Sequence, residues 1–465
     1  MLMKLFDTKT GVLQDFKPLV PGRVSIYVCG PTVQSAPHIG HLRSALVYDL
    51  LSRWLTATGL QVKLVRNVTD IDDKVLEKAA ESGVAWWQLA HENEQLFAND
   101  YRSLLIGSPA AEPRATGHIT QMISLIESLV ERGYAYKGLD GSGSVYFDTA
   151  NWASYGALTH QKLEDLESES TDPAKKNPQD FALWKSRKES EPDTASWPST
   201  FGFGRPGWHV ECSAMSAYYL GEQFDIHGGG LDLRFPHHEN ELAQSLAAGH
   251  KFANYWVHNG LVTTQGQKMS KSLGNSVSSA DLFGKVSDKA VRYYLASAHY
   301  RSVLDYQPES TLEAAAALSR LHGFVLRSRR ELSETQFSSV DEAALPQEFT
   351  DHMNDDLNIP AALAVIHEAA RAGNTDLDEQ RLSQASKRRS EVVAMLKVLG
   401  LSADSSEDQN LEHQALDGVI QTLISERNMA REDKNYQRAD QIRDQLLEIG
   451  IELADSPAGT HWSLN

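Results

Sequence analysis

The distribution of apolar and polar positions near the start of the chain predicts a strand, a helix and a second strand. The β-branched run before Cys29 is typical of a strand. After Gly40, apolar residues recur at helical spacing, namely Leu42, Leu46, Val47, Leu50 and Leu51. A second β-rich run, 62–68, follows a turn at Gly59. We interpret this order as a βαβ unit whose first loop ends at a helix N-terminus.

The pattern changes after residue 112. A helix is expected over 119–133, followed by short strands such as 143–147. The polar run at 161–177 cannot bury much apolar surface, so we interpret this part of the chain as an insertion with an exposed loop.

Strands are predicted again at 224–227 and 255–262, separated by a helix that opens near Pro236. Beyond residue 290 the pattern is helical, and the spacing of one apolar set is that of a buried helix face: Val392, Met395, Leu396 and Leu399. The last stretch, from about 411, is expected to be one long helix followed by a short α+β module.

We therefore expect an α/β protein, with a Rossmann-like parallel-sheet domain, a connective insertion, a helical bundle and a small α+β C-terminal module. The expected boundaries are 1–112 and 207–290 for the two halves of the Rossmann-like domain, 113–206 for the insertion, 291–401 for the bundle and 402–465 for the C-terminal module.

Composition places the chain among ordinary globular proteins, because 41% of its 465 residues are hydrophobic and 23% are charged. The formal net charge of −18 argues against nonspecific coating of nucleic acid, although local basic patches remain compatible with a nucleic-acid substrate. Two cysteines exclude a disulfide framework and fit a reducing compartment. Residues 1–10 lack an apolar signal region and no run approaches membrane-spanning length, so we expect a cytoplasmic protein without a membrane partner.

Two polar segments are candidates for binding phosphate. His38 and His41 lie at the predicted helix N-terminus, where backbone N–H groups favour an anion; the alternative is that both only satisfy local backbone groups. Lys268 and Lys271 lie three residues apart on a polar loop, and a lysine can serve as a mobile cation for phosphate. The alternative there is a solvated surface loop.

Polar residues also follow two of the predicted strands. The glycines at 228–230 are expected to form a loop that lets backbone approach a ligand, and Asp232 could accept hydrogen bonds from ribose hydroxyls. Thr69 and the acidic run after it lie where α/β sheets bind ligands, although the same residues could cap a helix.

The two cysteines predict a metal site if the strands that we expect before Cys29 and Cys212 end at the same sheet edge. His237 and Glu241 are four residues apart at a helix start, so they project from one face. Two thiolates, an imidazole and a carboxylate suit zinc. His238 is equally adjacent, and spacing does not choose between the two histidines. Buried cysteine acting as a small hydrophobe is the alternative.

Several of these motifs resemble a known family. His38-Ile39-Gly40-His41 and Lys268-Met269-Ser270-Lys271-Ser272 resemble the paired signature motifs of class I aminoacyl-tRNA synthetases, in the same order and separation. Four further blocks are similar to the cysteinyl-tRNA synthetases: 27–30, 67–73, 207–213 and 235–241. The resemblance runs through the whole chain; one departure is Gln34-Ser35, where many members have Tyr-Asp.

The resemblance implies a zinc site and an amino-acid pocket. The zinc ligands would be Cys29, Cys212, His237 and Glu241. The resemblance thus selects His237 over His238. Gly30, Thr69 and Trp208 match positions that line the pocket for L-cysteine. A pocket cannot strongly reject serine by size, whereas zinc prefers sulfur, so discrimination of ~10⁴ needs no editing site.

The resemblance also implies the reaction, which is ATP-dependent attachment of L-cysteine to its tRNA through a cysteinyl-adenylate. The amino-acid carboxylate is already ionised, so positioning and charge stabilisation carry catalysis. The residues expected to hold ATP and Mg²⁺ are His38, His41, Gly229, Asp232 and Lys271, with Lys268 assisting.

The C-terminal module is expected to bind tRNA. Four basic residues with helical spacing would form one stripe along the expected helix: Arg427, Arg431, Lys434 and Arg438. The alternative is a solvated face paired with nearby acids. The resemblance adds Arg443, Asp444 and Trp462 as candidates for contacting anticodon bases. We expect a monomer.

Two other functions are compatible with parts of this pattern. The mycothiol-pathway ligase, which joins cysteine to an amino sugar, shares the catalytic domain, but it lacks a comparable anticodon module and has a degraded second signature. A non-catalytic paralogue that binds tRNA or zinc would not need intact motifs. The intact 268–272 loop and the residues beyond 402 favour the synthetase.

Overall fold

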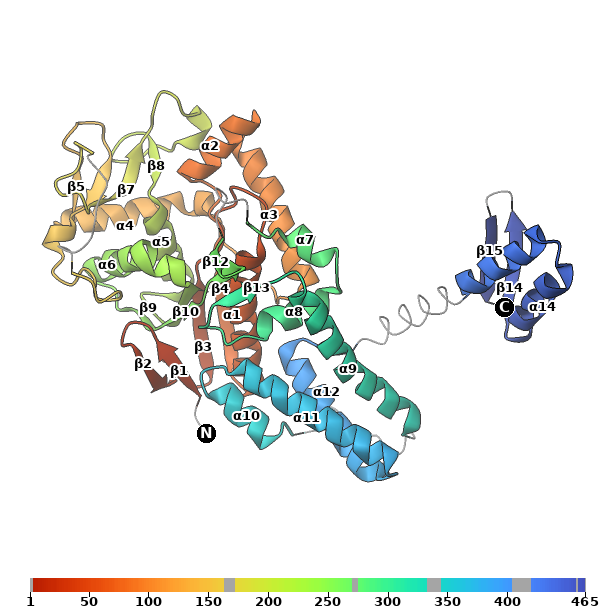
Figure 1. Cartoon of the computed structure of the whole chain (residues 1–465). Helices are drawn as coiled ribbons and strands as arrows, with labels where there is room; N and C mark the ends of the chain where they lie inside the picture. The colour runs from red at the N-terminus through yellow and green to blue at the C-terminus, as the bar shows by residue number, and fades with distance from the viewer. Residues whose placement is uncertain are drawn as a thin grey trace. The chain divides into compact units, whose positions relative to one another are not determined.

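The structure is a computed structural model, which describes residues 3–162, 172–269, 275–332, 344–403, 420–456 and 459–464. The chain divides into two units, residues 1–401 and 402–465 (Figure 1). Within the described ranges, none of the helices combines the length and apolar character needed to cross a bilayer.

Four parallel strands form the central sheet of the first unit, in the order β10–β9–β3–β4. Their bounds are Phe252–Asn259, Gln223–Gly230, Arg23–Val28 and Gln61–Arg66, respectively. Helix α1, Ile39–Ala57, links β3 to β4 and buries the whole predicted apolar stripe. The predicted βαβ unit is confirmed.

The strand order fixes where a ligand can bind. From β3 the chain passes through α1 to β4 on one side, whereas β9 pairs with β3 on the other side. Such a reversal opens a crevice outside the carboxyl ends of the two central strands. Cys29 directly follows β3, and Gly230 ends β9, so both lie at this crevice.

An antiparallel sheet forms the insertion between β4 and β9. It contains β5 (Ala135–Lys137), β6 (Val145–Phe147), β7 (Phe181–Ser186) and β8 (Gly204–Pro206), in sequence order. Helix α4, Ile119–Glu131, precedes it, and α5, Trp208–Leu220, returns the chain to the central sheet. Part of the predicted polar loop, 163–171, lies outside the described residues.

The remaining elements of the first unit come before, between and after the strands of the central sheet in the sequence. The chain begins with a hairpin of β1 (Lys4–Asp7) and β2 (Val12–Asp15). Helices α2 (Asp73–Ser82) and α3 (Trp86–Ser103) follow β4, and α6 (Glu239–Ala247) lies between β9 and β10. Beyond β10, a small sheet of β12–β11–β13 contains Gln267–Lys268, Val262–Thr264 and Leu304–Tyr306.

Helices then dominate, as the sequence predicts. They are α7 (Ser279–Phe283), α8 (Asp288–Ala296), α9 (Ser310–Glu331), α10 (Gln347–Asn354), α11 (Ile359–Asp378) and α12 (Leu382–Leu399). The predicted apolar face, Val392 to Leu399, is buried on α12.

The second unit has a helical hairpin and a β-hairpin around its own apolar core. Residues 420–432 are helical, α14 is Tyr436–Glu448, and β14 (Ile451–Ser456) pairs antiparallel with β15 (Gly459–Leu464). The core contains Ile420, Ile424, Ile442, Leu446, Ile451 and Leu453.

The predicted single long helix is wrong. The chain turns at 433–435, where Lys434 adopts a left-handed φ of 59° and the Asn435 side chain accepts a hydrogen bond from Arg438 N, which caps α14. The expected basic stripe therefore divides: Arg427 and Arg431 lie on the first helix, Lys434 lies in the turn and Arg438 lies on α14.

Candidate active site

A pocket of about 440 Å³ opens at the crevice between β3 and β9. The walls include both ends of the loop that follows β3. Among its lining residues are Cys29, Gly30, His38, His41, Arg66, Trp208, Gly230, Asp232, Asn259 and Met269. Cys29 of the expected metal ligands therefore shares one cavity with expected nucleotide residues such as His38, His41 and Asp232, although these positions span about 200 residues of the sequence.

His38 and His41 form the N-terminal cap of α1. Gly40 N donates to His38 Nδ1 at 3.2 Å, and His38 N donates to His41 Nδ1 at 3.3 Å. Their rings stack with centroids 3.7 Å apart. Both histidines thus satisfy local backbone groups and also line the pocket, so the two alternatives raised from the sequence are compatible.

Cys29, Cys212, His237 and Glu241 come together beside this pocket, all buried. Cys29 Sγ lies 3.5 Å from Cys212 Sγ and 3.2 Å from Glu241 Oε1, and His237 Nε2 lies 3.0 Å from the same oxygen. Tetrahedral zinc with metal–ligand bonds of 2.0–2.3 Å separates its ligand atoms by about 3.3–3.8 Å. The three measured separations lie within about 0.3 Å of this range, and all four donor atoms lie within 4.8 Å of one another, so the donor set fits a zinc ion.

The route by which Cys212 reaches the site differs from the prediction. Cys212 follows no strand; it lies in the second turn of α5, which begins at Trp208. The Gly204–Pro206 strand ends just before that helix. Only glycine fits at position 207, because a Cβ there would lie 2.0 Å from Ala182 O. The helix N-terminus, rather than a strand end, aims the thiol at Cys29.

Two further histidines, His227 and His209, contact Glu241 and His237 and so orient these two candidate ligands. His227 Nε2 lies 2.8 Å from Glu241 Oε2, which leaves Oε1 facing Cys29 and His237. His209 Nδ1 lies 3.1 Å from His237 Nδ1, which directs Nε2 of His237 into the cluster. Outer-shell partners of this kind fix ring orientation and ligand basicity.

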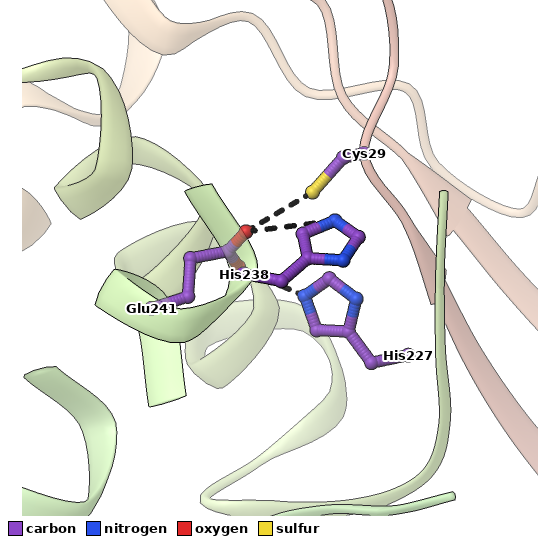
Figure 2. Close-up of side chains that lie close together, drawn as sticks. All are labelled: Cys29, His227, His238 and Glu241. Carbon is purple, nitrogen blue, oxygen red and sulfur yellow. Dashed lines mark hydrogen bonds and ion pairs between the residues drawn. The ribbon is translucent and has the colours of Figure 1, made fainter. Parts of the chain in front are cut away.

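A second donor set overlaps the first. Figure 2 shows Cys29, His227, His238 and Glu241, whose donor atoms also lie within 4.8 Å of one another. His238 Nε2 is 4.0 Å from Glu241 Oε1, and Nε2 of His227 is already engaged with the other carboxylate oxygen. His238 Nδ1 instead contacts His258 Nε2 at 2.8 Å. The shorter contacts favour the set with Cys212 and His237.

Two acidic groups of the cluster ionise readily despite their burial. Burial alone would raise the pKa of the Cys212 thiol, but its contacts with Cys29 and His237 bring it to about 6. Burial likewise opposes ionisation of Glu241, yet His227 and His237 lower its pKa to about 2. Burial raises the pKa of Cys29 well above its usual value, with Cys212 and Glu241 adding to the effect. Cys212 and Glu241 are therefore the anionic members of the cluster at neutral pH, and their charges raise the pKa of His237 to about 10 against the effect of burial.

The expected amino-acid residues lie next to the cluster, with one difference. The Trp208 ring centroid is 4.2 Å from that of His237, and Gly30 N donates to Asn67 Oδ1 at 2.9 Å. Thr69 is buried and is not among the lining residues; its Oγ1 donates to Glu211 Oε2 at 2.9 Å. The helix-cap alternative holds for Asp72, which accepts from Lys74 N.

The glycines at 228–230 do not form the expected loop, because they are the last residues of β9. A Cβ at Gly228 would lie 2.2 Å from the Tyr48 ring, and one at Gly229 would lie 2.7 Å from His238 Cε1. These two glycines thus admit side chains of the protein itself. Gly230 and Asp232 line the pocket, whereas Gly229 does not.

The second signature segment is described only in part. Lys268 ends β12 and Met269 lines the pocket, while Lys271 lies outside the described residues. In the C-terminal unit, Arg427 is buried, Arg438 pairs with Glu426 at 2.7 Å, and Trp462 packs against the core. Arg431, Lys434, Arg443 and Asp444 are exposed.

Sequence reasoning missed His209 and His227. His209 directly follows Trp208 and His227 precedes the glycines, so both were visible as histidines beside predicted site residues. Their roles depend on contacts with residues 28 and 14 positions away, which no local pattern reveals.

Comparison with known proteins identifies the family of the chain. Residues 15–317 match the class I tRNA synthetase (C) catalytic domain, 348–403 match the DALR domain, and 413–462 match the cysteinyl-tRNA ligase anticodon binding domain. The cysteine–tRNA ligase of Renibacterium salmoninarum is 53% identical, with 100% of this chain and 99% of the relative covered. That of Clavibacter michiganensis is 54% identical, with 100% of both covered.

Solved structures agree at the level of fold. A Mycobacterium tuberculosis methionyl-tRNA synthetase bound by methionyl-adenylate has a TM-score of 0.59 at 16% identity, covering 83% of this chain and 90% of that one. The fold is that of a class I aminoacyl-tRNA synthetase. Within that class, the chain belongs to the cysteine–tRNA ligase family.

Proposed function

We propose that this chain is an enzyme that attaches L-cysteine to its tRNA in two steps: cysteine first reacts with ATP to give a cysteinyl-adenylate and pyrophosphate, and the cysteinyl group then passes to the terminal ribose of tRNA with release of AMP. One observation carries the proposal: a buried Cys₂-His-Glu cluster adjoins the same pocket as a histidine-capped helix N-terminus. The cluster suits a thiol substrate, and the helix N-terminus suits phosphate. Family membership supports the same activity.

Zinc is the cofactor that we propose for the cluster. Its ligands would be Cys29, Cys212, His237 and Glu241, the set with the shorter contacts and with an outer-shell histidine behind both His237 and Glu241. When bound, zinc supplies a soft Lewis acid that prefers the cysteine thiolate over the hydroxyl of serine. Gly30, Thr69 and Trp208 would shape the pocket, with Thr69 acting from behind its wall.

Positioning and charge stabilisation would drive adenylate formation. His38 and His41 hold the ATP phosphates at the N-terminus of α1, where the helix dipole also favours negative charge. Lys268 and Lys271, with Mg²⁺, stabilise the leaving pyrophosphate. Asp232, which lines the pocket, would accept hydrogen bonds from the ribose hydroxyls of ATP, and Gly229 would act from its place next to Gly230 at the end of β9. The cysteine carboxylate attacks the α-phosphorus without a general base, because it is already ionised.

The second unit would bind the tRNA anticodon. Four of the candidate residues are exposed and would make the phosphate or base contacts: Arg431, Lys434, Arg443 and Asp444. Arg427, Arg438 and Trp462 would act mainly through the packing of the module, because of the burial, ion pair and core contacts described above. We further propose that the domain boundaries given from the sequence separate these roles, and that the enzyme acts as a cytoplasmic monomer.

A comparison of two acceptors tests the proposed function. The protein, loaded with zinc, is given ATP and radiolabelled cysteine together with either tRNA or glucosaminyl-inositol. We expect labelled tRNA and no labelled amino sugar. Ligation to the sugar alone would identify the mycothiol-type activity instead, and the absence of both products would favour a non-catalytic binding protein.

A further inference from the structure

Arg43 occupies an unusual position on α1. It follows His41 by two residues, its side chain is only 1% exposed, and none of its contacts in the described part of the chain is an ion pair with a carboxylate. Burial lowers the pKa of its guanidinium to about 10, so the group remains charged at neutral pH. A buried cation without a counter-ion is costly and needs hydrogen bonds that compensate for lost water.

Four backbone carbonyl groups supply those hydrogen bonds. Nη1 donates to Gly260 O at 3.2 Å and to Leu261 O at 2.8 Å. Nη2 donates to His299 O at 3.1 Å and to Ser302 O at 2.6 Å. The planar guanidinium therefore joins two segments, 260–261 and 299–302, to each other and to α1.

The first of these segments is a wall of the active-site pocket. Asn259, Gly260, Leu261 and Val262 line the pocket together with His38, His41 and Ser44 of α1. Ser44 Oγ donates to Asn259 Oδ1 at 3.0 Å, which shows how closely wall and helix approach. This wall, residues 259–262, also leads into β11 and so toward Lys268.

The wall has little room to move while Arg43 holds it. Gly260 N donates to Tyr300 O at 2.7 Å, and a Cβ at residue 260 would lie 2.3 Å from Ser302 O. A lysine at position 43 keeps the charge, but its single ammonium cannot reproduce the two-pronged geometry of the guanidinium. Loss of the guanidinium would free the wall relative to His41. Misplacement of a reacting group by about 1 Å can lower the rate on the order of 100-fold.

We propose that Arg43 is a positioning residue for ATP: by binding four carbonyl groups, it holds the 259–262 wall against the helix that carries His38 and His41. It touches no substrate itself. The inference rests on the proposed function, because it assigns the wall to the nucleotide side of the adenylation pocket and leaves the cysteine side, at Cys29 and Trp208, unaffected.

Steady-state ATP–pyrophosphate exchange of Arg43→Lys and Arg43→Gln tests this role, with KM measured separately for ATP and for cysteine. We expect KM for ATP to rise about tenfold and KM for cysteine to change less than about twofold. Zinc content should equal that of the unchanged protein. Arg43→Gln keeps two donors without the charge, so a larger effect in Arg43→Gln would indicate that charge adds to geometry.

Arg292→Lys is the matched control. Arg292 is equally buried and binds Leu104 O, Leu399 O and Asp49, but none of these partners lines the pocket, whereas Gly260 and Leu261 do. We expect the Arg292→Lys substitution to lower the melting temperature without changing the KM for ATP or for cysteine. Equal changes in both KM values for the Arg43 variants would overturn the proposal. It would also be overturned if Arg292→Lys unfolded cooperatively while neither Arg43 variant did so. If the unchanged protein shows no exchange, the proposed function itself fails.

Discussion

Buried histidines distinguish the two donor sets that could hold the proposed zinc ion. His237 and His238 are adjacent in the sequence and both are fully buried, yet their rings face different partners: His237 meets Cys212 and Glu241, whereas His238 meets His258. Local spacing could not separate them, because the choice depends on where β9, β10 and α6 bring His227, His258 and Glu241. The family resemblance selected His237, and the contact distances favour the same residue.

Substitution of each histidine separates the two donor sets. We expect His237→Gln to lose zinc, with affinity lowered at least about 100-fold, because a direct ligand is removed. His238→Gln should retain one zinc per chain, and Cys212→Ser provides a positive control for loss. Metal content after dialysis and competition with a chromogenic chelator measure the difference. Loss of zinc in His238→Gln with retention in His237→Gln would assign the metal to the other set.

The catalytic candidates differ in how far sequence alone reveals them. Cys29, His38 and His41 could be placed from one strand–loop–helix pattern, because their geometry is local. His227 and Arg43 could not, since each acts through groups far away in the chain. Gly229 was predicted to lie in a ligand-binding loop, whereas it lies within β9, and only the packed structure shows that His238 fills the space beside it.

At the scale of elements, turns and helix N-termini position the side chains of the site. The crossing of the β3–α1 loop with the segment after β4 is especially close: a Cβ on Gly30 would lie 1.7 Å from Asn67 O. The sequence predicted the strands on both sides, but it could not predict this contact between them. The prediction for Cys212 failed at the same scale, because the residue lies on a helix and the prediction placed it at a strand end.

Gly30→Ala tests that crossing. Because backbone atoms must move, we expect a loss of about 2–3 kcal/mol in the free energy of unfolding and a higher KM for cysteine. Gly117→Ala is the matched control, since nothing lies within 4 Å of its Cβ position and its stability should change by less than about 0.5 kcal/mol. Urea unfolding followed by circular dichroism measures both. Equal stability of the two variants would contradict the contact.

A charged network joins the insertion to the first residue of α2. Asp73 contacts Lys185 at 2.5 Å and also pairs with the buried Arg205, which in turn contacts Glu191 at 2.6 Å. Burial would raise the pKa of Asp73, but Lys185 and Arg205 hold it at about 2. Because the folded pKa is below the unfolded value, ionised Asp73 stabilises the fold at neutral pH, and this contribution is lost as pH falls toward 2.

Asp73→Asn should therefore cost about 1–2 kcal/mol at pH 7, after allowance for the partial exposure of the pair. The difference from the unchanged protein should stay constant from about pH 8 to 5 and shrink below about pH 4. Asp193→Asn, which removes an exposed partner of Arg187, should cost less than about 0.5 kcal/mol. Urea unfolding across this pH range measures both variants, and a difference that grows on acidification would contradict the assignment.

At the scale of the whole molecule, the chain has two units with separate cores. Residues 1–401 contain the pocket and the metal cluster, while residues 402–465 contain the apolar core around Ile442. Composition and periodicity could predict the α/β class and the helical C-terminal half. They could not predict the helix break at Lys434, because Asp433-Lys434-Asn435 lacks the glycine or proline that usually marks a turn.

Removal of the second unit tests this division of roles. A fragment of residues 1–401 should activate cysteine at a rate within about twofold of the full chain, since all pocket residues are retained. Charging of tRNA should fall by at least about 100-fold, because the proposed anticodon contacts are lost. The two assays are compared on the same preparations. Full charging by the fragment would show that the second unit is dispensable for tRNA binding.

The central claim is that the buried Cys₂-His-Glu cluster selects a thiol amino acid for activation by ATP. Amino-acid-dependent ATP–pyrophosphate exchange, measured with cysteine and with serine on zinc-loaded protein, tests it most directly. The account predicts rapid exchange with cysteine and a specificity constant at least about 10⁴ lower for serine, without any editing step. Exchange of similar rate with both amino acids, or none with cysteine, would contradict it.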